Sequence, residues 1–330
     1  MSDSTAATSP SAAVAGHPEF VELHQQNPEA VRAELIAGLL ASTAFTSPKY
    51  LYDALGSRLF EAITELPEYY PTRTEAAIFR AYAADMAALK PAAATLVDLG
   101  AGNCAKAAGL FEAFAPARYV AVDISVAFLR QALGSLQSQH PGLPMVGVGM
   151  DFSSAFSLPA QAGAGPHVLF YPGSSIGNFT PEAALLFLQQ LRSACEGGGL
   201  LIGVDLCKPR ALLEPAYDDA LGVTAAFNRN LLMHLNALIG SNFKLADWQH
   251  VAFFNEADSR IEMHLQALRA VTVSWPGGER RFAKDERIHT ENSYKWRQAD
   301  FAKLLLSAGF AQTRAWTDER GWFAVFWAAA

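Results

Sequence analysis

Short apolar runs alternate with helical stretches over the middle of this 330-residue chain. The apolar runs predict buried strands at 95–99, 118–123, 145–150, 167–172 and 199–205. The segments between them space their apolar residues as helices do, at 104–114, 126–137 and 181–195. Short buried strands that are separated by helices form a parallel sheet with right-handed crossovers. We therefore predict an α/β fold whose binding edge lies at the carboxyl ends of these strands.

The segment before this block is mostly helical. Residues 1–18 are rich in Ala, Ser and Thr and have no periodic pattern, so we expect a disordered tail there. Asn27 and Pro28 open a predicted helix over 29–41. The run TRTE at 72–75 fits a capping box, which predicts that another helix starts there and runs to about Leu89.

The segment after the block has a different character. Its predicted elements are a helical stretch over 211–240, a β-rich stretch over 251–275, a further β run that ends near Thr290, a helix over 298–308, and strands over 310–316 and 322–327. The last two strands surround a short polar turn and predict an antiparallel hairpin. The helical and β-rich stretches interrupt the sheet pattern, so we interpret them as an insertion that forms a second domain.

A glycine turn follows the first predicted strand of the sheet. Gly100 and Gly102 lie between that strand and the next helix, and Asp123 ends the second strand roughly 20 residues later. A turn from strand to helix presents free backbone N–H groups, and glycine lets a ligand approach that backbone closely. An acidic side chain at the second position would accept hydrogen bonds from ribose hydroxyls. The stretch therefore predicts a nucleoside-cofactor site.

The glycine turn alone leaves the cofactor open. With Ala105 as the third small residue it also fits the loose NAD-binding pattern, and a tight turn without any ligand is a further interpretation. Two features favour S-adenosylmethionine. Asp98, two residues before Gly100, can face a cationic methionine amino group. The predicted terminal hairpin is the usual end of an S-adenosylmethionine methyltransferase sheet, whereas a simple dehydrogenase would lack it.

Charge and composition narrow the classes of partner. The net charge is −7 and no basic run occurs, which argues against a nucleic-acid partner. No apolar run approaches the ~20 residues that cross a bilayer, and the chain does not open with a secretory signal. Three cysteines without ligand spacing are typical of thiols in a reducing cytosol, so we expect a cytoplasmic protein. No exposed apolar stripe stands out, and we expect a monomer.

The sequence gives no pattern for a metal site. Asp218 and Asp219 are adjacent carboxylates that no cluster of further ligands completes. Among the histidines, His234, His250, His264 and His289 show no ligand spacing. We interpret these histidines as structural or surface residues and expect no metal.

Several longer motifs resemble one protein family. They lie in order over residues 20–330: YLYD at 50–53 with GS at 56–57, LPEYYPTRTE at 66–75, GNF at 177–179, YDD at 217–219, VTAAFNRN at 223–230 and ENS at 291–293. On these motifs the chain resembles the histidine-specific Nα-methyltransferases of ergothioneine biosynthesis. Each long motif is far more specific than a glycine turn.

The resemblance implies an activity and a set of site residues. The activity is the successive transfer of three methyl groups from S-adenosylmethionine to the α-amino group of L-histidine, which gives hercynine. The family's cofactor residues correspond to Gly100, Lys106, Asp123, Asp151 and Phe152. Its substrate residues correspond to Tyr69 and Tyr217 at the carboxylate, Asn178 and nearby Tyr52 at the amine, and Glu291, Ser293 and Met263 around the imidazole. The expected partners are L-histidine and its mono- and dimethylated intermediates.

These features together predict two domains. One is a Rossmann-like S-adenosylmethionine methyltransferase domain with a C-terminal antiparallel hairpin, formed by residues 73–207 and 295–330. The other is an α+β substrate-binding domain, formed by residues 19–72 and 208–294. We expect the second domain to lie over the carboxyl ends of the parallel strands.

The implied chemistry suits these residue types. Displacement on a sulfonium requires a neutral amine that is aimed at the methyl group, so alignment and desolvation are the main tasks of the protein. Asn178 can hold the amine through its carbonyl without adding charge, and the Tyr52 hydroxyl can orient it. We expect the amine to lose its proton to solvent between rounds. Lys106 lies in the first turn of a helix, where a cation is unfavourable, which favours a role toward the cofactor carboxylate.

Three alternatives stay open beside this interpretation. The same chemistry could act on another amino acid such as tryptophan, but Glu291, Ser293 and Met263 look suited to an imidazole. An NAD-dependent dehydrogenase would lack the terminal hairpin and would need a catalytic His or Lys arrangement. A catalytically silent scaffold with the cofactor fold would have no reason to keep the complete set of site residues.

Overall fold

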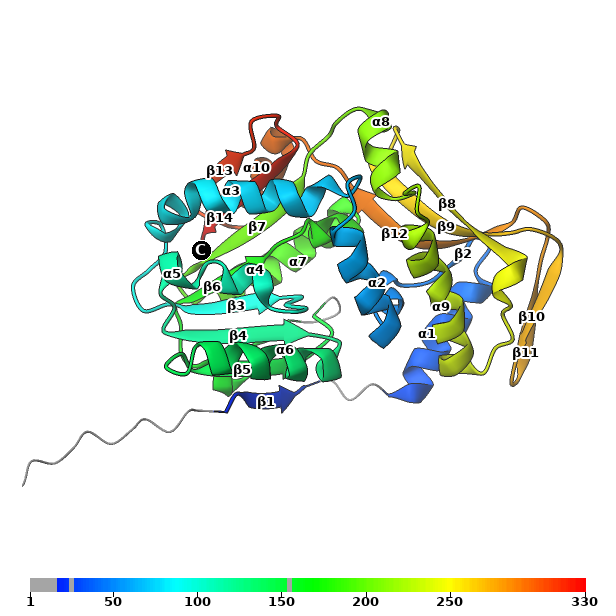
Figure 1. Ribbon diagram of the computed structural model, residues 1–330, viewed down its shortest axis with the longest axis horizontal. Coiled ribbons are helices and arrows are strands. Elements are labelled where there is room, and N and C mark those ends of the chain that lie inside the picture. Colours follow the sequence, from blue (N-terminus) through cyan, green and yellow to red (C-terminus); the bar gives the residue numbers. More distant parts are fainter. Residues whose placement is uncertain (1–16, 24–26, 153–155) are drawn as a thin grey trace, which may run out of the picture.

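The large sheet of the computed structural model, which describes residues 17–23, 27–152 and 156–330, has the strand order β1-β5-β4-β3-β6-β7-β14-β13. Its strands are β1 (Glu19–Glu22), β3 (Thr95–Leu99), β4 (Arg118–Asp123), β5 (Met145–Gly149), β6 (His167–Tyr171), β7 (Gly199–Asp205), β13 (Gln312–Thr317) and β14 (Phe323–Ala329). The strands from β1 to β7 run parallel, and β14 and β13 close the sheet as an antiparallel hairpin (Figure 1). The predicted α/β fold with its terminal hairpin is confirmed.

Helices cover both faces of this sheet (Figure 1). They are α3 (Tyr70–Ala87), α4 (Ala105–Ala108), α5 (Phe111–Phe114), α6 (Val126–Gln139), α7 (Pro181–Ala194) and α10 (Gln298–Ser307). Successive residues of a strand point to opposite faces. Val97 of β3 therefore joins the core under α7 and α10, whereas Leu96 joins the core under α3 and α6. Strands that are buried on both faces explain the continuous apolar runs in the sequence.

A second, four-stranded sheet has the order β2-β12-β9-β8. Its strands are β2 (Ala44–Phe45), β8 (Trp248–Asn255), β9 (Arg260–Ala267) and β12 (Arg287–Tyr294), and β10 (Val271–Trp275) pairs with β11 (Gly278–Phe282) in a separate hairpin. The helices α1 (Pro28–Leu40), α2 (Ala54–Thr64), α8 (Arg210–Leu213) and α9 (Val223–Ile239) lie on this side of the molecule (Figure 1). One apolar core joins this sheet to α1 and α9.

The structure corrects two predictions about local structure and adds one strand. The predicted helix 104–114 is two short helices, α4 and α5, that are separated at Gly109 and Leu110. The capping box at 72–75 is wrong, because α3 already begins at Tyr70 with Pro71 in its first turn. The strand β1 was not predicted, and it pairs in parallel with β5 at the edge of the large sheet.

Two further expectations, the disordered tail and the division into two domains, stay predictions. The predicted tail 1–18 lies outside the described residues except at its last two positions. The division into two domains stays a prediction, although β1 belongs by its pairing to the large sheet and not to the small one. Within the described part of the chain, no helix combines the length and the apolar character needed to span a membrane.

Candidate active site

A pocket between the two sheets gathers the predicted substrate residues. It is lined by Tyr52, Phe60, Ile63, Tyr69, Gly173, Ser174, Ser175, Asn178, Ala216, Tyr217, Thr224, Phe227, Met263, Glu291 and Ser293. All seven residues that the family resemblance assigned to the substrate are in this set. They come from segments that are more than 200 residues apart in the sequence, so only the fold brings them together.

Asn178 reaches the pocket from the loop after β6. It is the last residue of the 3₁₀ helix η3 (Ser175–Asn178), which packs against β12. A Cβ atom on Gly177 would lie 2.9 Å from the backbone oxygen of Tyr294, which is closer than real Cβ contacts come. Glycine at this position therefore lets the loop that carries Asn178 approach the strand that carries Glu291 and Ser293.

The strand β12 presents Glu291 and Ser293 to the pocket. The two residues are two positions apart, so their side chains leave the strand on the same face. Met263 of β9 is the direct partner of Glu291 in the sheet and lines the same pocket. Burial raises the pKa of the Glu291 carboxyl to about 7, although the nearby ammonium of Lys295 lowers it in part. A carboxylate that is this poorly solvated is a strong acceptor for a ligand N–H group.

Three tyrosine hydroxyls reach the pocket. Burial raises the pKa of Tyr52, Tyr69 and Tyr217 well above the ordinary value, so each phenol stays protonated and can donate a hydrogen bond. The Tyr217 hydroxyl lies 2.7 Å from Ser293 Oγ. Its ring and that of Tyr69 are 6.4 Å apart. Two neutral donors therefore lie side by side near the residues of β12.

Three aromatic rings that line the pocket lie close together. The ring of Tyr52 lies 5.5 Å from that of Phe60 and 5.4 Å from that of Phe227, in both cases edge to face. Phe60 and Phe227 are 6.0 Å apart. Such rings present π electrons that attract a cation. The pocket therefore has a polar side that binds hydrogen-bonding groups and an aromatic side that can face positive charge.

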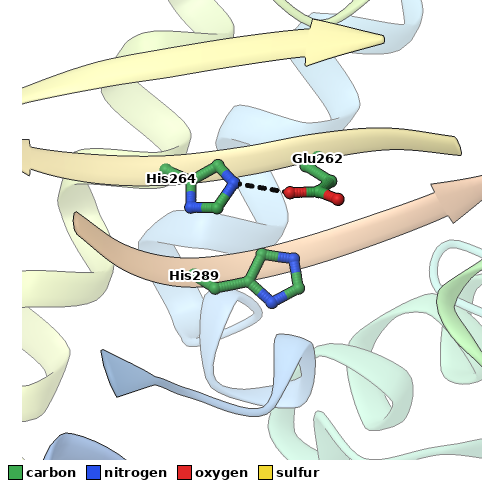
Figure 2. A group of neighbouring side chains, drawn as sticks. All are labelled: Glu262, His264 and His289. Carbon is green, nitrogen blue, oxygen red and sulfur yellow. Dashed lines mark hydrogen bonds and ion pairs between the residues drawn. The ribbon is translucent and has the colours of Figure 1, made fainter. Parts of the chain in front are cut away.

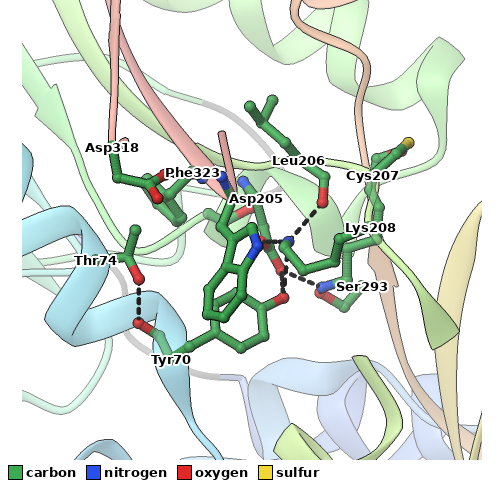
Figure 3. Close-up of polar contacts among 12 residues, drawn as sticks. Tyr70, Thr74, Asp205, Leu206, Cys207, Lys208, Ser293, Asp318 and Phe323 are labelled. Carbon is green, nitrogen blue, oxygen red and sulfur yellow. Dashed lines mark hydrogen bonds and ion pairs between the residues drawn. The ribbon is translucent and has the colours of Figure 1, made fainter. Parts of the chain in front are cut away.

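A buried ion network contacts the pocket, and sequence reasoning missed it; Figure 3 shows its members Asp205, Lys208 and Tyr70. Asp205, the last residue of β7, accepts from Lys208 at 2.5 Å and from Lys295 at 2.8 Å, and the Tyr70 hydroxyl donates to it at 2.7 Å. The two lysines hold the pKa of the Asp205 carboxyl below its ordinary value in spite of its burial. Lys295 also donates to Tyr217 and thereby connects this network with the pocket.

The glycine turn and its neighbours have the geometry of a cofactor site. Gly100 and Gly102 both have positive φ values, +72° and +52°, which glycine adopts without strain. Asp123 accepts from the Gly102 N–H at 2.9 Å and from the Ser125 N–H at 2.8 Å. A Cβ atom on Gly100 would lie 3.8 Å from the ring of Phe152. The turn, the acidic residue and the aromatic residue thus converge at the carboxyl ends of β3 and β4.

Asp98, which we expected to face a ligand, is bound by another side chain of the protein. It is buried, and its Oδ2 accepts from the Tyr119 hydroxyl at 2.8 Å. Its Oδ1 has no hydrogen-bond partner among the residues that the structure describes. Burial raises the pKa of this carboxyl to about 7. One oxygen of Asp98 is therefore held by Tyr119, and the other is buried without a donor among the described residues.

Lys106 has a partner that the sequence did not reveal. Its Nζ lies 2.7 Å from Glu75, a residue of α3 that is 1% exposed. Glu75 also accepts from the backbone N–H of Gly173 at 2.8 Å. Glu75, predicted to cap a helix, instead connects the helix after the glycine turn with the loop that carries Asn178. No local motif signals this contact, because its members are far apart in the chain.

The fifth predicted cofactor residue, Asp151, forms an ion pair near the turn. Lys49 Nζ lies 3.2 Å from Asp151 and 3.0 Å from Glu34 of α1. The side chain of Asp151 is 6% exposed, whereas that of Glu34 is 44% exposed. The pair joins the end of β5 to the segment before α2.

Two histidines and a glutamate lie together on the far side of the small sheet. Glu262, His264 and His289 have potential ligand atoms within 4.8 Å of one another, although the sequence showed no ligand spacing (Figure 2). His264 Nε2 lies 2.9 Å from Glu262, and Glu262 also accepts from Arg260 at 2.8 Å. His289 Nε2 lies 3.1 Å from the backbone oxygen of Glu291. These contacts give each of the three side chains a structural role.

Comparisons with known proteins agree with this geometry. The model of a family described as "Histidine-specific methyltransferase, SAM-dependent" matches residues 31–330. The histidine N-alpha-methyltransferase of Mycolicibacterium smegmatis is 41% identical over 89% of this chain and 93% of its own length. That of Mycobacterium tuberculosis is 38% identical over 91% of this chain and 95% of its own length. The ergothioneine biosynthesis protein 1 of Neurospora crassa is 33% identical over 81% of this chain but only 31% of its own length. This chain belongs to the family of S-adenosylmethionine-dependent, histidine-specific methyltransferases.

Proposed function

We propose that this enzyme transfers three methyl groups in succession from S-adenosylmethionine to the α-amino group of L-histidine and releases hercynine. The observation that carries the proposal is the pocket between the sheets. It combines two phenol donors, an amide, a buried carboxyl and a serine hydroxyl, which together complement the polar groups of histidine. The names of the two mycobacterial relatives, each matched over more than nine tenths of its length, support the same reaction.

The residues around the glycine turn fit the cofactor. S-adenosylmethionine supplies an activated, electrophilic methyl group when it is bound. The residues proposed to hold it are Gly100, Lys106, Asp123, Asp151 and Phe152. Asp123 is proposed to accept from ribose hydroxyls in addition to the backbone N–H groups that it already binds, with the ligand next to Gly100.

The substrate amine is proposed to lie against Asn178 and Tyr52. An amide oxygen accepts from the amine without adding a charge that would stabilise its protonated form. The hydroxyl of Tyr52 stays protonated at neutral pH and can orient the amine. The two side chains thus align a neutral nucleophile, and the amine loses its proton to solvent between rounds.

Both ends of histidine are proposed to be recognised in the same pocket. Tyr69 and Tyr217 would donate to the two carboxylate oxygens. Glu291 would accept from one imidazole N–H, and Ser293 would donate to the other ring nitrogen. Met263 is the partner of Glu291 in the sheet, and it is proposed to limit the space for a larger ring. A site that hydrogen-bonds both ring nitrogens rejects side chains that lack them, because its buried polar groups would go unpaired.

The product carries a fixed positive charge and no N–H donor. The rings of Tyr52, Phe60 and Phe227 lie on the side of the pocket that is proposed to face the amine. Aromatic faces stabilise a quaternary ammonium group by cation–π attraction. These rings are proposed to accommodate the additional methyl groups of the mono- and dimethylated intermediates.

The enzyme is proposed to act as a monomer in the cytoplasm. The sequence shows no exposed apolar stripe that would mark a subunit interface, which supports the monomer. The cysteines Cys104, Cys195 and Cys207 are free thiols, which supports a reducing compartment.

A reaction with mixed substrates tests the proposal. Purified protein is incubated with S-adenosylmethionine and equal amounts of the twenty amino acids, and the products are identified by mass spectrometry. We expect a gain of three methyl groups on histidine alone. Methylation of tryptophan or another amino acid would overturn the roles of Glu291 and Ser293, whereas no methylation in spite of cofactor binding would overturn the substrate class.

A further inference from the structure

Lys295 is buried, yet it makes contact with two side chains of the pocket. Its side chain is 0% exposed. Its Nζ lies 2.8 Å from the Tyr217 hydroxyl, 2.8 Å from Ser293 Oγ and 2.8 Å from Asp205. An ammonium group has three N–H donors and no acceptor, so these three contacts use all of its hydrogens.

A count of protons on the two hydroxyls shows why this contact matters. Tyr217 and Ser293 lie 2.7 Å apart, so in the empty pocket one of them donates to the other. That arrangement leaves one hydroxyl proton for a ligand. The proposed function requires two, because Tyr217 donates to the carboxylate while Ser293 donates to the imidazole. The hydrogen bond between the hydroxyls must therefore open when histidine binds.

Lys295 can compensate for the opening. It donates to both oxygens from behind the pocket, so each oxygen keeps a hydrogen bond after its own proton turns toward the ligand. Resting on the proposed function, we propose that Lys295 is a positioning residue: its buried ammonium group lets Tyr217 and Ser293 donate to histidine at the same time. The carboxylate and the imidazole are then recognised together, which favours a ligand that carries both groups.

Asp205 explains why the ammonium group stays in this place. It lies at the carboxyl end of β7 and binds both Lys295 and Lys208. Removal of one lysine still leaves the carboxylate with a cation, so no unpaired buried charge results. The side chain of Lys208 is also buried, at 2% exposure, but it contacts Tyr70 and the oxygen of Leu206 and not the pocket hydroxyls. It therefore serves as a matched control.

The experiment compares Lys295→Met with Lys208→Met. Each variant is first saturated with S-adenosylhomocysteine, whose binding verifies the fold, and calorimetry then measures binding of L-histidine and of histamine, which has no carboxylate. We expect Lys295→Met to bind histidine about 10- to 100-fold more weakly, since a hydrogen bond involving a charged group is lost. We expect histamine affinity to change less than about threefold, because Tyr217 can then donate to Ser293 while Ser293 donates to the ring. Lys208→Met should keep both affinities within about threefold.

The outcomes separate this inference from the proposed function. If the unaltered enzyme does not bind histidine, the proposed function fails. If it binds histidine but Lys295→Met behaves as Lys208→Met does, or loses histidine and histamine equally, the positioning role of Lys295 is refuted.

A second measurement stands even if Lys295→Met does not fold. It is a double-mutant cycle of Tyr217→Phe and Ser293→Ala with histidine as the ligand. Because the hydroxyls bind each other before histidine binds but not in the complex, each single variant avoids the cost of opening this hydrogen bond. The double variant should therefore lose about 3- to 10-fold more affinity than the product of the two single losses. A double loss equal to that product would mean that the hydroxyls keep their hydrogen bond in the complex, and it would refute the inference.

Discussion

Replacement of Glu291 by Gln changes the charge at the proposed imidazole end of the pocket without changing its shape. Burial raises the pKa of the Glu291 carboxyl from 4.5 to about 7, which corresponds to a cost of about 3 kcal/mol for its charged form. A ligand N–H that binds the carboxylate offsets part of this cost. Hydrogen bonds with a charged partner contribute about 1.5–3 kcal/mol, so Glu291→Gln should weaken histidine binding by about 10- to 100-fold at pH 8.

The same variant should weaken histidine binding but increase the free energy of unfolding, relative to the unaltered enzyme, as the pH rises. The pKa of Glu291 is higher in the folded chain than in the unfolded chain, so unfolding releases protons between pH 4.5 and about 7. The stability contributed by this group is therefore fully present below pH 4.5 and is lost as the pH rises to about 7. Gln does not titrate. The free energy of unfolding of Glu291→Gln, relative to the unaltered enzyme, should increase by about 2 kcal/mol between pH 5 and pH 8.

Two assays check this prediction. Calorimetry with the cofactor product S-adenosylhomocysteine present measures histidine binding, and denaturant unfolding at pH 5 and pH 8 measures stability. A difference in unfolding free energy that is the same at both pH values would show that the carboxyl is not perturbed by burial. Unchanged histidine affinity at pH 8 would show that Glu291 does not contact the ring.

The other predictions concern the amine, the cofactor and pH. Asn178→Ala should lower kcat at least about tenfold while S-adenosylhomocysteine affinity stays within about threefold, because the amide aligns only the amine; a loss of cofactor affinity with normal kcat would contradict this. Asp123→Ala should weaken S-adenosylhomocysteine binding by about 1–2 kcal/mol in calorimetry, and equal affinities would remove Asp123 from the cofactor site. Glu75→Gln should lower Tm by about 2–4 °C, since the two donors at 2.7 and 2.8 Å lose their anionic acceptor; an unchanged Tm would show that these contacts add no stability. The ratio of histidine affinities between the unaltered enzyme and Glu291→Gln should fall from pH 8 to pH 6, because the Glu291 carboxyl takes up a proton near pH 7. A ratio that stays constant would argue against an ionised acceptor.

The sequence predicted the large sheet well because its signals are local. Each parallel strand is buried on both faces, so its residues form a continuous apolar run such as that of β3. The terminal hairpin is marked by two β runs around a polar turn. The edge strand β1 escaped prediction because four residues with exposed ends carry little hydrophobic signal. The capping box failed for a related reason, since Pro71 starts α3 earlier and leaves Glu75 to face the interior.

The proposed substrate residues were predictable only through long motifs, and the residues that contact them from behind were not. Glu291 and Ser293 lie in a short run whose spacing on β12 gives both the same face. Lys295 follows the last residue of β12, and its ammonium group reaches Tyr217 and Ser293 from behind the pocket. What the sequence does not reveal is that β7 brings Asp205 against this lysine from a segment 90 residues away. A buried ammonium group is tolerated only where a carboxylate and acceptor oxygens surround it, and those partners come from the fold. The buried ammonium charge beside the pocket therefore depends on how the two sheets pack against each other.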